Sequence, residues 1–110
     1  MKPELKLRHY LVLLALADGA RHGLAIARDV RELSDGAVRL WPATLYGTLD
    51  ELLERRWIEE LDEHPVTESE KKRFYTLTRP GRQALASETD RLAALVRTAR
   101  TRLRRTGAMS

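Results

Sequence analysis

The 110-residue sequence contains no cysteine. Without thiols it has no disulfide framework, no thiolate metal site and no cysteine nucleophile. Its three histidines, His9, His22 and His64, are far apart, and none stands at metal-ligand spacing from another. The sequence also lacks a glycine-rich phosphate loop, and its serines fall at element ends, in loops or on a polar helix face. We therefore expect no metal site, no cofactor and no enzyme.

Long hydrophobic runs are also missing. No apolar stretch approaches the ~18 residues that a membrane-spanning helix needs. The opening MKPELKLRHYLVLLALADG superficially resembles a signal peptide, with a basic start and an apolar stretch. However, Arg8 and His9 precede that stretch, Asp18 closes it, and no small-residue cleavage site follows. We expect one cytoplasmic domain without a membrane segment, since this length suffices for one small core.

Acidic residues are scarce only toward the end of the chain. Residues 79–110 hold 8 Lys and Arg against 2 Asp and Glu, a net charge of +6, whereas residues 1–78 hold 12 against 14, a net charge of −2. A basic segment suits nucleic acid as a partner. A basic solvated helix gives the same sum, so charge alone leaves both interpretations open.

Helical spacing of apolar residues predicts three helices in the first half of the chain. They cover about residues 5–18, 22–34 and 42–55, with Gly19 placed to end the first helix. Pro42 suits the first turn of the third helix, where its missing N–H is not needed. Trp41 before it has no side-chain acceptor to cap that helix.

Two β-strands are predicted downstream, at residues 57–63 and 72–78, where β-branched and aromatic side chains occur. The polar, proline-containing residues 64–71 would join them as a hairpin loop. Three helices followed by a hairpin make the order of a winged helix-turn-helix, in which the third helix enters the DNA major groove and the loop is the wing. The expected fold class is mainly α with a small β-hairpin.

A fourth helix is predicted from Arg79, with Thr78 as its N-cap. Its apolar residues recur at spacings of 7, 4, 3 and 4 and form a seam: Leu85, Leu92, Val96, Ala99 and Leu103. So small a body cannot bury the whole seam, which predicts pairing with a second copy of the chain. Folding back onto its own domain is the alternative. We predict a DNA-binding domain over 1–78, a dimerisation helix over 79–105 and a disordered tail over 106–110.

The stretches PATLYGTLDELLERRWIEEL and KRFYTLTRPGRQAL strongly resemble the PadR family of bacterial transcriptional regulators, and RHGLAIARDV resembles the opening of the family's second helix. The resemblance covers about residues 8–105. It implies a homodimeric repressor that binds double-stranded operator DNA and releases it when a small hydrophobic effector binds at or near the dimer interface. It also implies that a single C-terminal helix dimerises, as in the family's short branch.

The chain departs from the family pattern at three positions. Leu24 stands where the family often has tyrosine, and Trp41 stands where a small polar N-cap is common. Trp57 replaces the usual leucine of the strand. We interpret Trp57 as a core residue, because large aromatic side chains chiefly serve packing, with an effector contact as the alternative.

The predicted third helix has an apolar stripe, Leu45, Leu49, Leu52 and Leu53, and a second face that points away from it. Ala43, Thr44, Gly47, Glu51 and Glu54 point outward there, with Tyr46 and Thr48 on the flanks. The two glutamates would repel DNA, so we expect DNA contact to be confined to the first two turns of the helix.

Small, uncharged side chains let a helix lie against base edges, and the hydroxyls of Thr44 and Thr48 can donate to bases or phosphates. The Tyr46 hydroxyl can reach the DNA backbone, with partial burial of this flank residue as the alternative. Gly47 costs ~1 kcal/mol relative to alanine inside a helix. Close approach to DNA would explain that cost, and so would packing against another element.

The predicted wing offers three consecutive cations, Lys71, Lys72 and Arg73, after an acidic stretch of its loop. Alternate residues of a strand face opposite ways, so at most two of them can contact phosphate together. A solvated charge run is the alternative. The net negative charge of residues 1–78 also suits a second function, a winged-helix module for protein–protein assembly that does not bind DNA.

Overall fold

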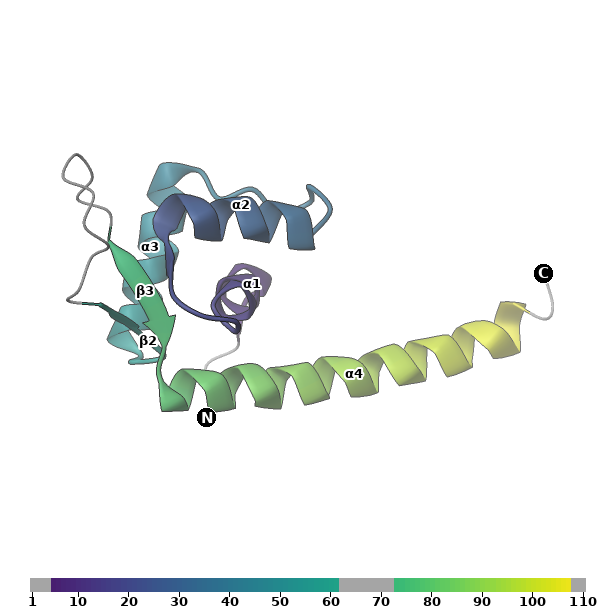
Figure 1. Cartoon of the computed structure of the whole chain (residues 1–110). Coiled ribbons are helices and arrows are strands. Elements are labelled where there is room, and N and C mark those ends of the chain that lie inside the picture. Colours follow the sequence, from purple (N-terminus) through teal and green to yellow (C-terminus); the bar gives the residue numbers. More distant parts are fainter. Residues whose placement is uncertain (1–4, 62–72, 108–110) are drawn as a thin grey trace.

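The computed structural model describes residues 5–61 and 73–107. Its elements are, in chain order, α1 (Leu7–Ala15), β1 (Arg21–His22), α2 (Gly23–Leu33), α3 (Pro42–Glu54), β2 (Ile58–Glu60), β3 (Phe74–Leu77) and α4 (Arg79–Gly107). The first three helices and the sheet form a body, and α4 runs beneath that body and projects well beyond it (Figure 1). Within the described ranges no helix is both long and apolar enough to cross a membrane.

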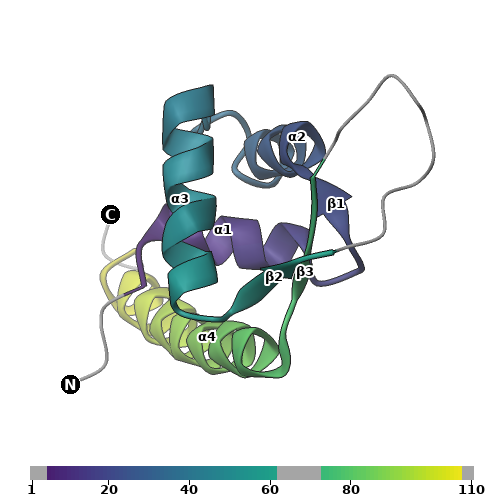
Figure 2. The same ribbon diagram turned by 90° about the vertical axis from the view of Figure 1, so that its left-hand side faces the viewer.

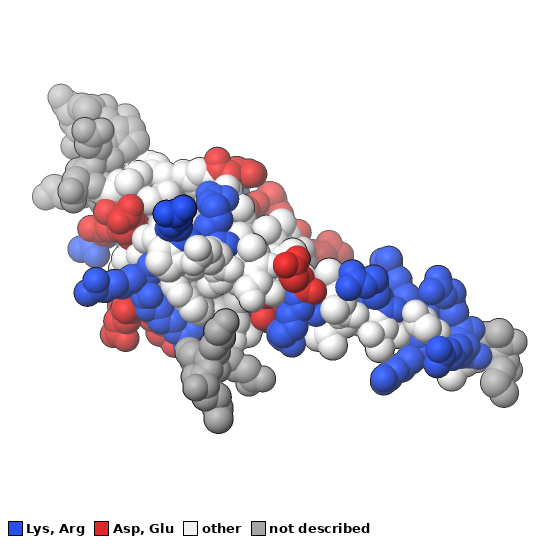
Figure 3. Space-filling view, turned by 90° about the horizontal axis from the view of Figure 1, so that it is seen from below, with Lys and Arg blue, Asp and Glu red and all other residues white. Residues whose placement is uncertain are grey.

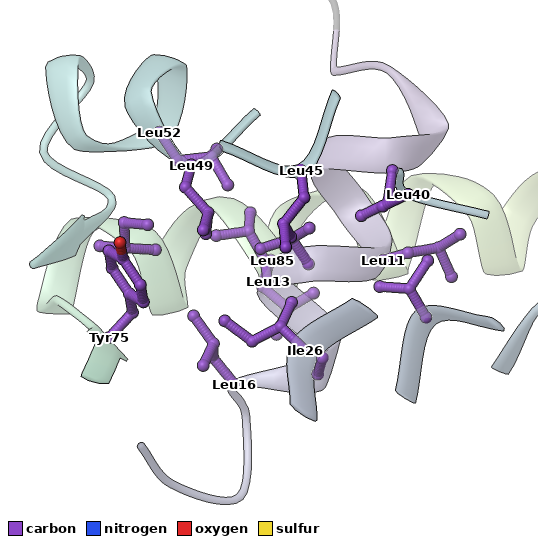
Figure 4. Packing of buried hydrophobic residues seen from close by; sticks show 14 residues of the cluster. Leu11, Leu13, Leu16, Ile26, Leu40, Leu45, Leu49, Leu52, Tyr75 and Leu85 are labelled. Atoms are coloured by element: carbon purple, nitrogen blue, oxygen red, sulfur yellow. The ribbon is translucent and has the colours of Figure 1, made fainter. Parts of the chain in front are cut away.

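The core lies where α1, α2, α3, the sheet and the start of α4 meet (Figure 4). The predicted leucine stripe of α3 is confirmed at Leu45, Leu49 and Leu52, which are fully buried, whereas Leu53 lies at the edge. Leu13 of α1 is fully buried in the same cluster. Each fully buried leucine stabilises the fold by roughly 2 kcal/mol relative to an exposed one, so this cluster holds the three helices together.

The sheet has three antiparallel strands in the order β1-β3-β2. The predicted hairpin pairing of β2 with β3 is confirmed, with Ile58 opposite Leu77. Both strands are shorter than predicted, and residues 62–72, including the expected wing loop, lie outside the described residues. The prediction of two strands missed β1, because two residues are too few to show an alternating pattern and only their pairing with β3 defines the strand.

Helix starts follow the expected capping chemistry. The His22 Nδ1 accepts a hydrogen bond from the Ala25 N–H at 3.3 Å, so this histidine caps α2. Trp41 makes no side-chain cap at the start of α3, and Pro42 occupies the first turn, both as predicted. Helix α1 is shorter than predicted, ending at Ala15 before a series of turns.

The start of α4 is fixed tightly to the body. Thr78 caps it as predicted, with Oγ1 accepting from the Gly81 N–H at 3.1 Å and donating to the Arg56 carbonyl at 2.6 Å. Gly81 is required there, because a Cβ at this position would lie 1.8 Å from the Trp57 carbonyl oxygen. Trp57 itself is partly buried against the core, which supports its interpretation as a packing residue.

Helix α4 continues to Gly107, two residues beyond the predicted boundary. The prediction of a disordered tail from residue 106 is therefore wrong for Thr106 and Gly107, which take the helical conformation of the preceding turns. Residues 108–110 lie outside the described part of the chain.

Candidate nucleic-acid interface

The first two turns of α3 are exposed on one side, where residues 41–44, 46 and 47 form a nearly continuous accessible surface. Helix α3 stands upright beside α1 and α2, with this first end farthest from α4 (Figure 2). Its leucines anchor the inner side in the core, so the outer side presents Ala43, Thr44 and Gly47. The predicted small, uncharged face therefore exists as an accessible surface.

Gly47 faces open space. Apart from its chain neighbours and the nearby backbone of α3, no atom of the described residues lies within 4 Å of a Cβ built at this position. Within residues 5–61 and 73–107, therefore, no other element packs against Gly47. The alternative that packing explains its small size has no support there. A glycine inside a helix costs about 1 kcal/mol relative to alanine, and no described residue supplies a packing reason for it at this position.

Thr48 is placed differently from the prediction, because its side chain is buried, at 1% exposure. Its hydroxyl donates to the Thr44 carbonyl at 2.7 Å and accepts from Arg8 Nε at 3.2 Å. The expectation that Thr48 presents its hydroxyl to DNA is wrong, since α1 covers that flank of the helix. Angular position on a helix identifies a flank, but the tertiary structure decides whether a neighbour covers it.

Tyr46 lies on the other flank, about half exposed. A Cβ at Gly23 would lie 3.0 Å from the Tyr46 hydroxyl oxygen, so the start of α2 lacks a side chain where this ring passes. The tyrosine hydroxyl therefore sits at the junction of α2 and α3. Sequence reasoning did not identify Gly23 as the residue that makes room for it.

Glu51 does not carry an isolated negative charge. Its Oε1 lies 3.2 Å from an Arg8 guanidinium nitrogen and 3.5 Å from His9 Nε2. The hydrogen bond from Arg8 lowers the pKa of this carboxyl, so it stays ionised and paired. The pairing with Arg8 partly neutralises the negative charge that the sequence places at this position.

His9 is the most buried ionisable side chain of this region, at 1% exposure. Burial lowers its pKa below the usual value, and the positive charge of Arg8 acts the same way, whereas Glu51 opposes the shift. The neutral imidazole is therefore the form that fits the interior between α1 and α3.

The cations predicted for the wing fall mostly outside the described residues. This holds for Lys71 and Lys72. Arg73 is exposed, and its Nε lies 3.5 Å from a Glu60 carboxylate oxygen. Such a surface pair contributes at most about 1 kcal/mol, so it leaves the guanidinium available to another anion.

The seam of α4 divides into two parts. Leu85 is buried in the core of its own chain and Leu92 is partly buried, whereas Val96, Ala99 and Leu103 are exposed, Leu103 at 67%. Leu95, which the seam prediction omitted, is also exposed. The alternative that the whole seam folds back onto its own domain is wrong, because α4 leaves the body after its first few turns (Figure 1).

Arginines surround the projecting part of α4. Seen from below, blue side chains gather along this segment, whereas the body shows both signs of charge (Figure 3). Residues 91–107 contain six arginines and no acidic residue. Among the described residues there is no group of three or more His, Asp or Glu side chains that could hold a metal ion.

A three-helix body, a small antiparallel sheet and an outward-facing third helix define a winged helix-turn-helix. The sequence model described as the transcriptional regulator PadR-like family matches residues 12–87. The chain belongs to this family of transcriptional regulators.

Solved structures share the fold. A PadR family transcription regulator from Clostridium difficile R20291 superposes with a TM-score of 0.77 at 19% identity, covering 89% of this chain and 99% of that one. Bacillus subtilis PadR in complex with operator DNA gives a TM-score of 0.66 at 24% identity, over 76% of this chain and 47% of that one.

A relative among curated proteins is an uncharacterized 37.1 kDa protein in transposon TN4556 of Streptomyces fradiae. It is 38% identical over 85 residues, which cover 77% of this chain. The match spans only 23% of the length of that relative.

Proposed function

We propose that this protein is a homodimeric repressor that binds operator DNA in the cytoplasm through α3 and the wing, has no enzymatic activity, and releases DNA when a small hydrophobic effector binds. The observation that carries the DNA-binding part is the accessible, small and uncharged surface of the first two turns of α3, with open space at Gly47. The major groove of DNA admits an α-helix, and small side chains let the helix backbone approach the base edges. Bacillus subtilis PadR, which shares the fold, was solved in complex with operator DNA.

Each proposed contact has a distinct chemical role. The hydroxyl of Thr44 can donate to a base edge or a phosphate, and the Tyr46 hydroxyl can reach the backbone. Ala43 and Gly47 would allow close approach. On the wing, Arg73, together with Lys71 and Lys72, would bind phosphates without reading sequence.

The exposed end of α4 supports the dimer. Leu95, Val96 and Leu103 line a helix that leaves the body, and a single helix with exposed leucines is marginally stable in water. A second copy of the same helix would cover these side chains. An effector of apolar character would bind where the two copies meet, because that is where exposed apolar surface is concentrated.

The test begins with a duplex selected by the wild-type protein from a random-sequence pool. In Gly47→Glu a carboxylate would face the groove, so affinity for that duplex should fall at least about a hundredfold through charge repulsion and bulk. Helix propensity improves when glutamate replaces glycine, so the melting temperature should hold or rise. Gly47→Gln is the matched control, because it adds the same bulk without the charge and should bind with intermediate affinity.

Two outcomes would contradict the proposal. If Gly47→Glu binds the selected duplex like the wild type, this face does not contact DNA. If the wild type enriches no duplex, and binding to DNA is absent even at low salt, the assembly-module alternative is favoured, since phosphate contacts strengthen as salt falls.

A further inference from the structure

Helix α1 lies between the helix proposed to dimerise and the helix proposed to bind DNA. It packs on α4 on one side and on α3 on another, and both contacts are visible in the two ribbon views (Figures 1 and 2). Polar side chains leave α1 toward both neighbours within three consecutive residues. Arg8 and His9 reach α3, and Tyr10 reaches α4.

Both connections end on a threonine hydroxyl. Arg8 Nε lies 3.2 Å from Thr48 Oγ1 on α3, and the Tyr10 hydroxyl lies 2.9 Å from Thr89 Oγ1 on α4. Each threonine also donates its single proton to the carbonyl four residues earlier in its own helix, both at 2.7 Å. Each hydroxyl is thus left as an acceptor, so α1 supplies the donor at both ends.

The connection to α3 is the more constrained of the two. Thr48 is buried, and the same guanidinium donates a second hydrogen bond to Glu51, one turn farther along α3, at 3.2 Å. A planar guanidinium that binds two successive turns fixes both the rotation and the height of that helix. The carbonyl that Thr48 binds belongs to Thr44, which lies on the outward face. The Thr48 hydroxyl therefore links Arg8 to the first turns of α3, which carry the proposed DNA-facing surface.

We propose that Arg8 is a positioning residue for DNA recognition: it orients α3 on α1, while Tyr10 fixes α1 to α4, so that the orientation of α3 follows the placement of α4. This inference rests on the proposed function. It adds that affinity for the operator depends on a side chain that does not touch DNA.

Three variants test the proposal with the full-length protein and the selected duplex. Arg8→Met keeps most of the aliphatic length and removes both donors, and should weaken binding roughly tenfold, the scale of one lost charged hydrogen bond. Thr48→Val preserves shape and removes the acceptor, and should also weaken binding. Because both act through one contact, the double variant should bind hardly more weakly than Arg8→Met alone. Tyr10→Phe, which cuts the link to α4, should give a smaller loss.

Salt dependence separates positioning from direct contact. Loss of a phosphate contact reduces the slope of log affinity against log salt by about one unit, whereas a positioning residue leaves the slope unchanged. Arg73→Met is the comparison variant, because its exposed guanidinium is a proposed phosphate ligand and its slope should fall. A reduced salt slope in Arg8→Met would overturn the proposal in favour of a direct phosphate contact. The same conclusion would follow if Arg8→Met still weakened DNA binding tenfold when added to Thr48→Val. Unchanged DNA affinity in Arg8→Met would also contradict the proposal.

Hydrogen exchange decides the inference without DNA. In Arg8→Met the amides of α3 should exchange about tenfold faster than in the wild type, while amides of α2 stay unchanged. Equal exchange in α3 would contradict the positioning role. A wild-type protein that binds no duplex would instead contradict the proposed function, and the exchange result would then show whether Arg8 still holds α3.

Discussion

The two halves of α4 are parts of one continuous helix, yet they differ in burial and in charge. In the first half Gly81 and Leu85 are buried against the body, and Thr78 caps the helix from within the same chain. In the second half Leu95 and Leu103 are exposed, and every charged side chain after Asp90 is an arginine. One half is stabilised by its own domain, whereas the other displays apolar surface beside unbalanced positive charge.

This difference shows that a regular helix does not imply uniform stabilisation. Propensity and backbone hydrogen bonds extend through the whole of α4, but an isolated helix of a few turns is marginal in water. The body supplies the missing stabilisation for the first half. The body supplies no such stabilisation to the second half, whose leucines are exposed, and this is the physical basis of the proposed dimer.

The largest expected effect on stability concerns the first half of α4, which packs against the body. Gly81→Ala would place a methyl group 1.8 Å from the Trp57 carbonyl oxygen. This backbone atom directly precedes β2 and cannot move without disturbing the start of that strand. We expect the free energy of unfolding to fall by about 3 kcal/mol, measured by urea denaturation. Gly107→Ala is the matched control in the projecting half. Apart from its chain neighbours and the nearby backbone of α4, no atom of the described residues lies within 4 Å of a Cβ at this position, so stability should change little. Equal effects of the two substitutions would contradict the comparison.

The next effect tests the projecting half. Leu92→Lys combined with Val96→Lys places two charges in the seam and should yield monomers in analytical ultracentrifugation, since charged side chains are excluded from the core of a dimer interface. The body should stay folded, as judged by its amide exchange. Ala94→Lys with Thr98→Lys has the same spacing and charge but lies off the seam, so this control should remain dimeric. A dimer that survives the seam substitutions would place the interface elsewhere.

A smaller effect concerns pH, to which only the body should respond. Burial lowers the pKa of His9 in the folded state below its unfolded value of 6.5. The unfolded chain therefore binds the proton first, so stability contributed by neutral His9 is present above about pH 6.5 and is lost as the pH falls toward the lower, folded-state pKa. Residues 91–107 contain no Asp, Glu, His or Lys, so nothing there titrates in this range.

The measurement is the melting temperature between about pH 8 and pH 5, the range in which histidine titrates. The decline on acidification should be shallower in His9→Leu than in the wild type. Parallel declines in the two proteins would show that His9 does not cause the loss.

The smallest expected effect concerns Gly47 in α3. Gly47→Ala should raise the free energy of unfolding by about 1 kcal/mol, because alanine has the higher helix propensity and its methyl group meets open space. Thermal denaturation in the absence of DNA measures this. A loss of stability would mean that some part of the protein covers Gly47 after all.

The sequence by itself determined the four helices, the β2–β3 hairpin and their inner faces. Leucines at helical spacing predicted the buried stripe of α3, Thr78 predicted the start of α4, and the order of elements predicted the winged helix-turn-helix. These features depend on local periodicity and capping, which act between residues close in the chain. The exposed positions of Ala43, Thr44 and Gly47 followed from the same periodicity.

Only the tertiary structure decided what lies against each face. Thr48 has nearly the same angular position as Thr44 in the helix, yet α1 buries one and leaves the other exposed. Strand β1 exists only because β3 lies beside it, and Gly81 is needed only because the Trp57 carbonyl occupies the space of a side chain. Periodicity shows which side of an element is apolar, but contacts between residues far apart in the chain arise only when the helices pack, so a one-dimensional pattern does not contain them.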